Sequence, residues 1–304
     1  VELAGGTPVV ITAGLEAGYR ITAAQLEAAI TPRTKWVILN SPSNPTGAGY
    51  AEAHLRELTD VLMRHPHVWV MADDIYEHLV YDDFKFTTIA QVCPELFDRT
   101  LTVNGVSKAY AMTGWRVGWM VVPPDHVRTV ERLAQNMFIC PPHASQTAAL
   151  AALDCIEEAE ANLSVYAENR RIMLERLPQI GFTRIAPPEG AFYIYADVSN
   201  LTEDSLGFCA EILDKAGVAV TPGLDFDPRR GAQTLRFSYA RATAEIAEGL
   251  DRLARGLAED GARRDELRRE AVEALAPILT QILDCLDRCR FCLNSFHAFI
   301  KQLT

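Results

Sequence analysis

The sequence predicts an α/β protein built on a mostly parallel sheet. Continuous apolar strands alternate with segments of helical spacing through the first half of the chain, as in sheets that carry helices on both faces. Reactive side chains follow the carboxyl ends of these strands, where open α/β sheets bind ligands. With 304 residues, 49% of them hydrophobic and 23% charged, the chain is long enough for two domains with cores of their own.

In the first half, short apolar runs predict strands, and apolar residues three and four apart predict helices. Leu55, Leu58 and Leu62 show this helical spacing. Most of these runs are nearly continuous in apolar residues, which is typical of strands in a parallel sheet. The expected strands are 7–12, 35–40, 68–72, 101–104 and 117–122, and the expected helices are 23–30 and 54–64.

The second half predicts a compact α+β unit. Residues 145–177 are mostly helical and are expected to form two helices, the second of which links two domains. Short strands and helices then alternate up to residue 257. The expected strands are 190–197, 218–221 and 234–239, and the expected helices are 205–216 and 243–257.

Charge and composition exclude several classes of protein. The net charge of -11 and the lack of a basic run argue against a nucleic-acid-binding surface. No stretch approaches the roughly 18 apolar residues of a membrane helix, and no signal peptide is visible. The seven cysteines are irregularly spaced, which favours reduced thiols and a cytoplasmic location.

Four spaced segments hold the residue types of a covalent cofactor site. Lys108 lies among small residues, and Arg116 follows eight residues later, an arrangement suited to a buried Schiff base with a phosphate anchor. Two other segments follow predicted strands, and the last adds a second arginine. The four are Ser41-Pro-Ser-Asn-Pro-Thr-Gly47, Ala72-Asp-Asp-Ile-Tyr76, the run from Thr102 to Trp119, and Leu235-Arg-Phe-Ser-Tyr239.

Together these segments resemble the class I (aspartate-type) aminotransferases, which carry pyridoxal 5′-phosphate (PLP). The resemblance runs from about Val1 to about Leu257, and residues 1–119 are most similar to bacterial aspartate or aspartate/prephenate aminotransferases. It implies the PLP-dependent transferase fold type I, with a PLP-binding large domain over 1–158 and a smaller α+β domain over 159–257. Residues 258–304 are expected to form a helical tail that the family lacks.

The resembled family begins well before Val1. The resemblance therefore implies a large domain that lacks its N-terminal part, including the first strand of its sheet. In the family this part carries a helix N-terminus that binds the phosphate and an aromatic side chain that stacks on the ring. We expect the chain to have low activity on its own.

The resemblance implies a role for each residue around the cofactor ring. Lys108 matches the lysine that forms the aldimine and moves the substrate's α-proton. Asp73 matches the carboxylate that keeps the pyridine nitrogen protonated, with Asp74 as the alternative, although an aspartate after a strand is also a common helix cap. Asn44 and Tyr76 match hydrogen-bond partners of the cofactor O3′. Lys108, Asp73 and Tyr76 are the expected catalytic residues.

The remaining roles concern the phosphate and the substrate. Arg116 is expected to bind the cofactor phosphate, with Ser107 as a weaker contact, because Gly105 replaces a hydroxyl residue that many relatives carry. Arg236, together with Asn44, is expected to bind the substrate α-carboxylate, although a strand arginine can equally be a structural ion-pair partner. Tyr193 is expected to pack the small domain without touching a ligand.

The tail carries two further patterns. Its apolar residues from Leu267 to Phe296 follow a helical period, which fits either a partner-binding helix or a helix docked on its own chain. Cys285, Cys289 and Cys292 have the spacing of a radical-SAM cluster, but only twelve residues follow, too few for the barrel that such chemistry requires. We expect no metal site.

The function implied is transfer of an amino group between an amino acid, with aspartate as the expected type, and a 2-oxo acid, by a cytoplasmic homodimer that binds neither nucleic acid nor membrane. Three alternatives stay open: a PLP-dependent carbon–sulfur lyase on the same fold, the effector domain of a transcription regulator, and an inactive remnant. Release of pyruvate from cystathionine separates the lyase from the aminotransferase.

Overall fold

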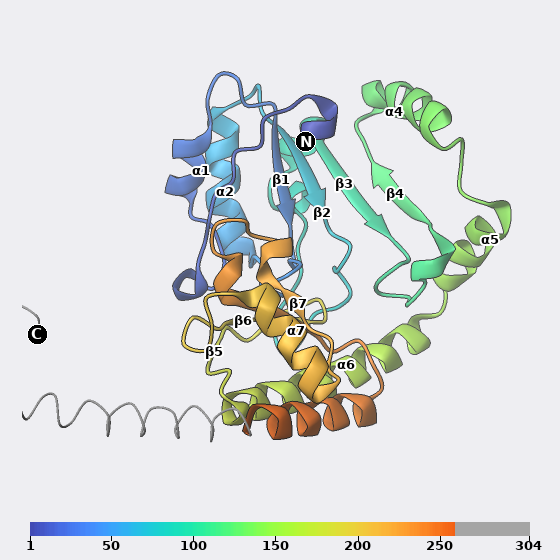
Figure 1. The fold of residues 1–304 in the computed structure, drawn as a ribbon. Coiled ribbons are helices and arrows are strands. Elements are labelled where there is room, and N and C mark those ends of the chain that lie inside the picture. The colour runs from blue at the N-terminus through green and yellow to red at the C-terminus, as the bar shows by residue number, and fades with distance from the viewer. Residues whose placement is uncertain (259–304) are drawn as a thin grey trace, which may run out of the picture. The chain divides into compact units, whose positions relative to one another are not determined.

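We describe residues 1–258 of the protein from a computed structural model. Residues 1–252 form one compact unit that contains two four-stranded sheets (Figure 1). The tail pattern from Leu267 to Phe296 and its three cysteines lie outside the described residues. Within the described part, no helix is long and apolar enough to cross a bilayer.

The first sheet has the strand order β1-β2-β3-β4. The first three strands are parallel and β4 is antiparallel to β3, which confirms the predicted mostly parallel sheet. Asn40 pairs with Asp73, and Asp73 pairs with Val103, so the three parallel strands end at one edge. The strands are β1 (Trp36–Asn40), β2 (Trp69–Asp73), β3 (Thr100–Gly105) and β4 (Gly118–Val121).

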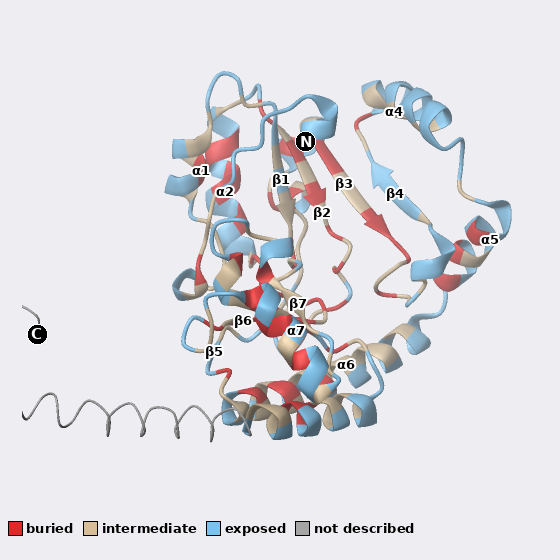
Figure 2. Ribbon diagram, viewed as in Figure 1, coloured by how far each residue is buried: buried red, intermediate tan, exposed pale blue. Residues whose placement is uncertain are grey.

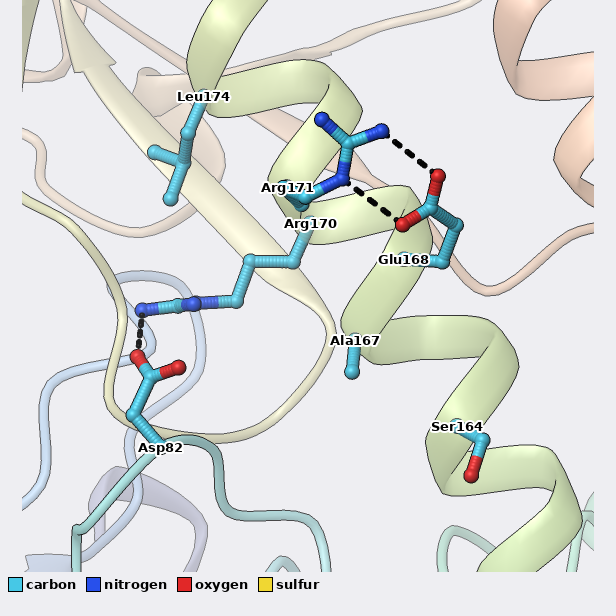
Figure 3. A pocket seen from close by; sticks show the side chains of 7 residues that line it. All are labelled: Asp82, Ser164, Ala167, Glu168, Arg170, Arg171 and Leu174. Carbon is cyan, nitrogen blue, oxygen red and sulfur yellow. Dashed lines mark hydrogen bonds and ion pairs between the residues drawn. The ribbon is translucent and has the colours of Figure 1, made fainter.

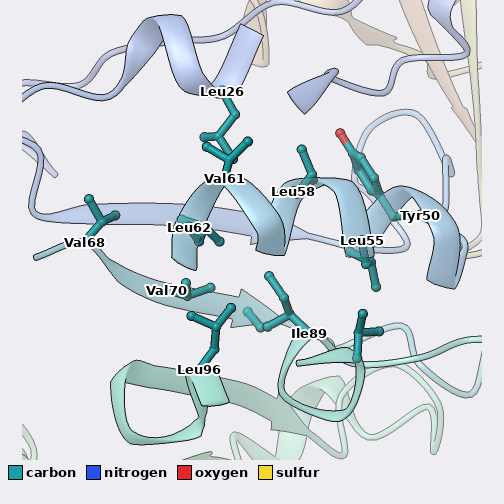
Figure 4. Close-up of a cluster of buried hydrophobic side chains, with 12 residues drawn as sticks. Leu26, Tyr50, Leu55, Leu58, Val61, Leu62, Val68, Val70, Ile89 and Leu96 are labelled. Atoms are coloured by element: carbon teal, nitrogen blue, oxygen red, sulfur yellow. The ribbon is translucent and has the colours of Figure 1, made fainter. Parts of the chain in front are cut away.

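Helices α1 (Ala23–Ala29) and α2 (Glu52–Arg64) pack against this sheet. Thr22 begins α1 with a capping box that it shares with Gln25, which satisfies the first free backbone N–H groups of the helix. Figure 4 shows Leu26 of α1 directed toward Val61 of α2, above the strand that carries Val70. The helical spacing of α2 therefore buries its apolar side chains, as the sequence predicts. Short helices α3 (Ile89–Val92) and η3 (Pro94–Arg99) complete this core.

The opposite face of the sheet is covered less completely than the sequence predicts. Trp36 and Ile38 of β1 are 43% and 53% exposed. The ring of His126, near the start of α4, contacts Trp69 with 4.5 Å between ring centroids. Helix α4 (Pro124–Met137) itself has no buried residue, and Figure 2 shows it and β4 largely exposed. The sequence interpretation assigned no helix to this segment.

The second sheet has the order β5-β6-β8-β7 and is antiparallel throughout. Asp204 caps the amino end of α7 (Ser205–Ala216), and Gly217 ends it in a left-handed conformation, so this helix has the predicted bounds. Helices α5 (His143–Ala152) and α6 (Ile156–Ile180) confirm the two helices expected before this sheet, and residues 243–258 are also helical. The strands are β5 (Arg184–Ile185), β6 (Tyr193–Asp197), β7 (Thr221–Pro222) and β8 (Thr234–Ser238).

Two strand predictions are wrong. Residues 7–12 have no strand partner, and Val9 and Val10 are 71% and 62% exposed. Of residues 218–221, only the last belongs to β7. An apolar run becomes a strand only where another strand supplies its hydrogen bonds, and the sequence pattern does not show that partner. Single 3-10 turns are η1 (Glu2–Ala4), η2 (Leu15–Ala17), η4 (Thr113–Trp115), η5 (Gly223–Asp225) and η6 (Gly231–Gln233).

The segment that leads into β6 runs between the loops that follow β1 and β2. The Gly190 N–H donates to the Gly47 carbonyl at 2.9 Å, and the Ala191 N–H donates to the Leu79 carbonyl at 2.8 Å. A Cβ on Gly190 would lie 2.4 Å from Cγ of Pro42, so only glycine fits this crossing. This contact brings the second sheet against the carboxyl edge of the first.

Candidate functional site

The loop after β1 presents Asn44 at the carboxyl edge of the first sheet. Asn40, the last residue of β1, holds this loop with both ends of its amide. Its Nδ2 donates to the Asp73 carbonyl at 2.9 Å, and its Oδ1 accepts the Asn44 N–H at 2.8 Å. The sequence interpretation overlooked Asn40, although a polar residue that ends an apolar strand is a usable signal.

Asp73 and Asp74, at the end of β2, differ in their surroundings. Asp73 is half-buried, and its Oδ1 accepts the Ile75 N–H at 3.4 Å. Burial raises the pKa of Asp73, while that N–H and the Lys108 ammonium both act to lower it. Asp74 is 4% exposed, and burial raises the pKa of its carboxyl to about 7. Lys108 is among the charges that act on Asp73 and not among those that act on Asp74, which favours Asp73 as its partner.

Lys108 lies in a tight turn after β3. The Met112 N–H closes this turn on the Val106 carbonyl at 3.3 Å, and the Ala111 N–H donates to the Lys108 carbonyl at 3.2 Å. The Lys108 side chain is half-buried, and no hydrogen bond or ion pair with residues 1–258 engages its ammonium. A half-buried amine beside a carboxylate and without a bonded partner is suited to covalent bonding with an aldehyde.

Gly105 has a structural reason to be glycine. A Cβ at this position would lie 2.8 Å from the Val117 carbonyl oxygen and 3.0 Å from the Gly118 Cα, across the β3–β4 hairpin. A hydroxyl residue therefore does not fit at position 105 without a shift of the backbone. Ser107 lies half-buried in the same turn as Lys108.

Arg116 follows the turn η4, lies two residues before β4, the return strand of this hairpin, and is exposed. Its backbone is left-handed, with a φ of 56°. Within the described residues, its guanidinium makes one hydrogen bond, to the Thr113 carbonyl at 3.0 Å. Asn104 pairs with Trp119 and Gly105 with Gly118, so the structure places Arg116 near the same edge of the sheet as Lys108. The side chains of Arg116 and Lys108 do not contact each other.

Arg236 extends from β8 of the second sheet to the loop after β1. Its Nη1 donates to Asn44 Oδ1 at 2.8 Å, and its Nη2 donates to Thr221 Oγ1 at 3.2 Å. Its Cζ lies 4.5 Å from the ring centroid of Tyr193 and 4.6 Å from that of Phe226. The structure therefore brings together the two predicted substrate residues, Arg236 and Asn44, which are 192 positions apart in the sequence.

Tyr76 and Tyr193 meet beside this pair. Both are buried, and their hydroxyl oxygens lie 3.1 Å apart. Burial raises the pKa of Tyr76, and its hydrogen bond with Tyr193 raises it further, so Tyr76 keeps its proton at neutral pH. The Tyr193 ring packs against Tyr76 and Phe192 and lies over the Arg236 guanidinium, so Tyr193 contacts two predicted site residues; that it touches no ligand stays a prediction.

A surface hollow on α6 is separate from these residues (Figure 3). Its two arginines are both paired with carboxylates: Arg170 with Asp82 at 2.9 Å, and Arg171 with Glu168 at 2.8 Å. None of its lining residues is a predicted site residue. We therefore place the candidate site at the carboxyl edge of the first sheet.

The residues at this edge fit PLP. Lys108 supplies an amine that no residue of 1–258 bonds, Asp73 supplies a carboxylate whose pKa the Lys108 charge lowers, and Tyr76 supplies a buried hydroxyl that keeps its proton. The buried Nε of Arg236 has no hydrogen-bond partner among residues 1–258, which leaves a donor for a carboxylate.

Comparison with known proteins finds aminotransferases that are similar over most of this chain. The aspartate/prephenate aminotransferase of Cereibacter sphaeroides is 46% identical over 265 residues, which are 83% of this chain and 65% of the relative. The crystal structure of the aspartate aminotransferase from Rhizobium meliloti is 42% identical, with a TM-score of 0.74 over 83% of this chain and 65% of that one. The Thermus thermophilus aspartate aminotransferase with maleate is 35% identical, with a TM-score of 0.76 over 84% and 65%.

The chain spans just under two thirds of the length of these relatives. Class I aminotransferases use PLP, and their structures share the fold of residues 1–252. The model of the family described as aminotransferase class I and II matches residues 1–253. The chain belongs to the class I and II aminotransferases.

Proposed function

We propose that this protein takes part in PLP-dependent transfer of an amino group between an amino acid and a 2-oxo acid. One observation carries the proposal. Lys108 lies within electrostatic reach of Asp73, at the ends of two neighbouring parallel strands. In a family that uses PLP, this is the pair that the chemistry requires, an amine for the aldehyde and an anion for the ring nitrogen.

When bound, PLP supplies an electron sink for the electrons released at the substrate α-carbon. Lys108 would hold the cofactor covalently and, once released, would accept and return the substrate's α-proton through Nζ. Asp73 would keep the ring nitrogen protonated by its negative charge. Tyr76 would donate its hydroxyl hydrogen to O3′, which its raised pKa allows because the proton stays on the oxygen at neutral pH.

Arg236 and Asn44 would bind the substrate α-carboxylate. A planar guanidinium suits a carboxylate, and the Asn44 contact holds one of its nitrogens in place. Arg116, with Ser107, would contact the cofactor phosphate at the exposed end of the β3–β4 hairpin.

Similarity to the aspartate/prephenate aminotransferase of Cereibacter sphaeroides and to the aspartate aminotransferase of Rhizobium meliloti supports aspartate as the substrate type. We further propose a cytoplasmic homodimer. The four cysteines within the described residues are free thiols, which suits a reducing compartment. We also propose that a PLP-binding large domain spans residues 1–158 and a smaller domain spans residues 159–257.

A PLP titration followed by visible absorbance tests this function. The unsubstituted chain should form an absorbing complex that borohydride reduction fixes as a pyridoxyl group on Lys108, as peptide mapping would show. Lys108→Ala should lose the band and the label, whereas Lys85→Ala, which changes an exposed lysine, should keep both. Identical spectra for the unsubstituted chain and Lys108→Ala would contradict the assignment.

A further inference from the structure

The Tyr193 side chain lies between the proposed cofactor and substrate contacts. Its hydroxyl oxygen lies 3.1 Å from that of Tyr76, and its ring centroid lies 4.5 Å from the Arg236 Cζ. We propose that Tyr193 is a positioning residue that orients the Tyr76 hydroxyl through its own hydroxyl and the Arg236 guanidinium through its ring. This inference rests on the proposed function of Tyr76 and Arg236.

The backbone around Tyr193 leaves its ring little freedom. Tyr193 begins β6 and pairs with Ser238 of β8. On the other side, a Cβ on Gly47 would lie 3.0 Å from the Tyr193 carbonyl oxygen, so the loop after β1 packs directly on this residue. With 6% of its surface exposed, Tyr193 is held by β8 and by the loop after β1.

The hydroxyl of Tyr193 determines which way the Tyr76 proton points. Tyr76 has a single hydroxyl proton, and the oxygen–oxygen contact allows either tyrosine to donate it. If Tyr76 donates to O3′, Tyr193 must donate to the Tyr76 oxygen. A hydroxyl that accepts one hydrogen bond becomes a better donor in the next, by roughly 10–30% per bond. Tyr193 would therefore strengthen the contact that stabilises the anionic form of O3′.

The ring of Tyr193 acts on a different partner. The Arg236 Cζ lies over the rings of both Tyr193 and Phe226, while Nη1 and Nη2 bond to Asn44 and Thr221. Aromatic faces attract a guanidinium without occupying its in-plane N–H groups. The rings can therefore orient the cation and still leave donors for a carboxylate.

These two actions are separable by substitution. Tyr193→Phe removes the hydroxyl and keeps the ring, whereas Tyr193→Leu removes both. Tyr195→Phe is a matched control: Tyr195 lies on the same strand, is 5% exposed, and bonds through its hydroxyl to Thr234 Oγ1 at 2.6 Å instead of to Tyr76. Tyr193→Phe and Tyr195→Phe both remove a buried tyrosine hydroxyl, but only Tyr193→Phe removes the contact with Tyr76.

Two measurements on the full chain test the inference. The first is the pH midpoint of the visible absorbance of PLP-loaded protein. Tyr193→Phe should raise this midpoint by about 0.3 pH unit, because a less stabilised O3′ anion holds the neighbouring proton more tightly. Tyr195→Phe should leave it unchanged.

The second measurement is calorimetric titration with maleate on PLP-free protein, which reports Arg236 without the cofactor. Tyr193→Leu should weaken maleate binding about fivefold, and Tyr193→Phe should keep it within about twofold. Near-ultraviolet circular dichroism of each variant checks that it is folded. The role of the Tyr193 hydroxyl is judged from Tyr193→Phe, which is the milder of the two substitutions.

The outcomes separate the two proposals. If the unsubstituted protein shows a Lys108-dependent band but Tyr193→Phe and Tyr195→Phe have the same pH midpoint, the proposed role of the Tyr193 hydroxyl is wrong. The proposed function is then unaffected. Equal maleate affinity in Tyr193→Leu and unsubstituted protein overturns the role of the ring. Absence of any Lys108-dependent band overturns the proposed function, and with it the coupling inferred here.

Discussion

Strand β6 of the second sheet and strand β4 of the first are packed very differently. Four of the five residues of β6 are buried, whereas all four residues of β4 are exposed. Arg236, a proposed substrate contact, and Tyr193, the proposed positioning residue, come from the packed sheet. Arg116, the proposed phosphate contact, comes from the hairpin that ends in β4. The substrate side of the proposed site is therefore preorganised within residues 1–258, whereas the phosphate side is held mainly by its own turn.

The largest expected effect is on stability. Leu235→Ala in β8 removes a fully buried side chain and should lower the free energy of unfolding by about 3 kcal/mol. Met120→Ala in β4 truncates a side chain that is 39% exposed and should cost less than about 1 kcal/mol. Urea denaturation of the two variants measures the difference. Equal losses would mean that β4 is packed in solution against something outside the described residues.

The next effect concerns ligand affinity. Arg236→Lys loses the planar fork that bonds Asn44 and Thr221, so maleate affinity should fall about 30-fold. Arg116→Lys changes an exposed side chain with one local hydrogen bond, and PLP affinity should fall only about threefold. Titrations with maleate and PLP measure both. A larger loss in Arg116→Lys than in Arg236→Lys would show that cofactor binding organises the hairpin, contrary to the comparison.

A smaller effect, the pH dependence of stability that arises from Asp74, tests whether the poor packing is confined to β4. Asp74, at the end of β2, has its pKa raised to about 7 by burial, against an ordinary value of 3.8. The folded protein therefore holds this proton at pH values where the unfolded chain has lost it. Stability from Asp74 is complete below about pH 4 and is lost as the pH rises toward 7, at about 1 kcal/mol per pH unit between pH 5 and 7.

Asp74→Asn should remove this slope, because the amide does not titrate in this range. Thermal unfolding from pH 5 to pH 8 gives the slope for each variant. Asp83→Asn, which changes an exposed aspartate in a nearby loop, is the control and should keep it. If Asp74→Asn shows the same pH dependence as the unsubstituted protein, then water reaches the Asp74 carboxyl and the end of β2 is as loosely packed as β4.

Local signals explain which elements were predictable. Helix α7 has the predicted bounds, and its start and end are set by Asp204 and Gly217, two capping effects that act within a few residues. Strands β1 to β3 follow from continuous apolar runs. Residues 7–12 show the same kind of run without forming a strand, since no neighbouring strand pairs with them.

The sequence by itself determined the residue types of the site and their order along the chain. Lys108, Asp73 and Asn44 could be named because each follows an apolar strand in a recognisable segment. Only the tertiary structure decided that Arg236 reaches Asn44, that Tyr193 lies between Arg236 and Tyr76, and that Arg116 stays exposed. The physical reason is that capping and apolar periodicity act over a few residues, whereas these contacts join side chains up to 192 positions apart and exist only once both sheets are packed.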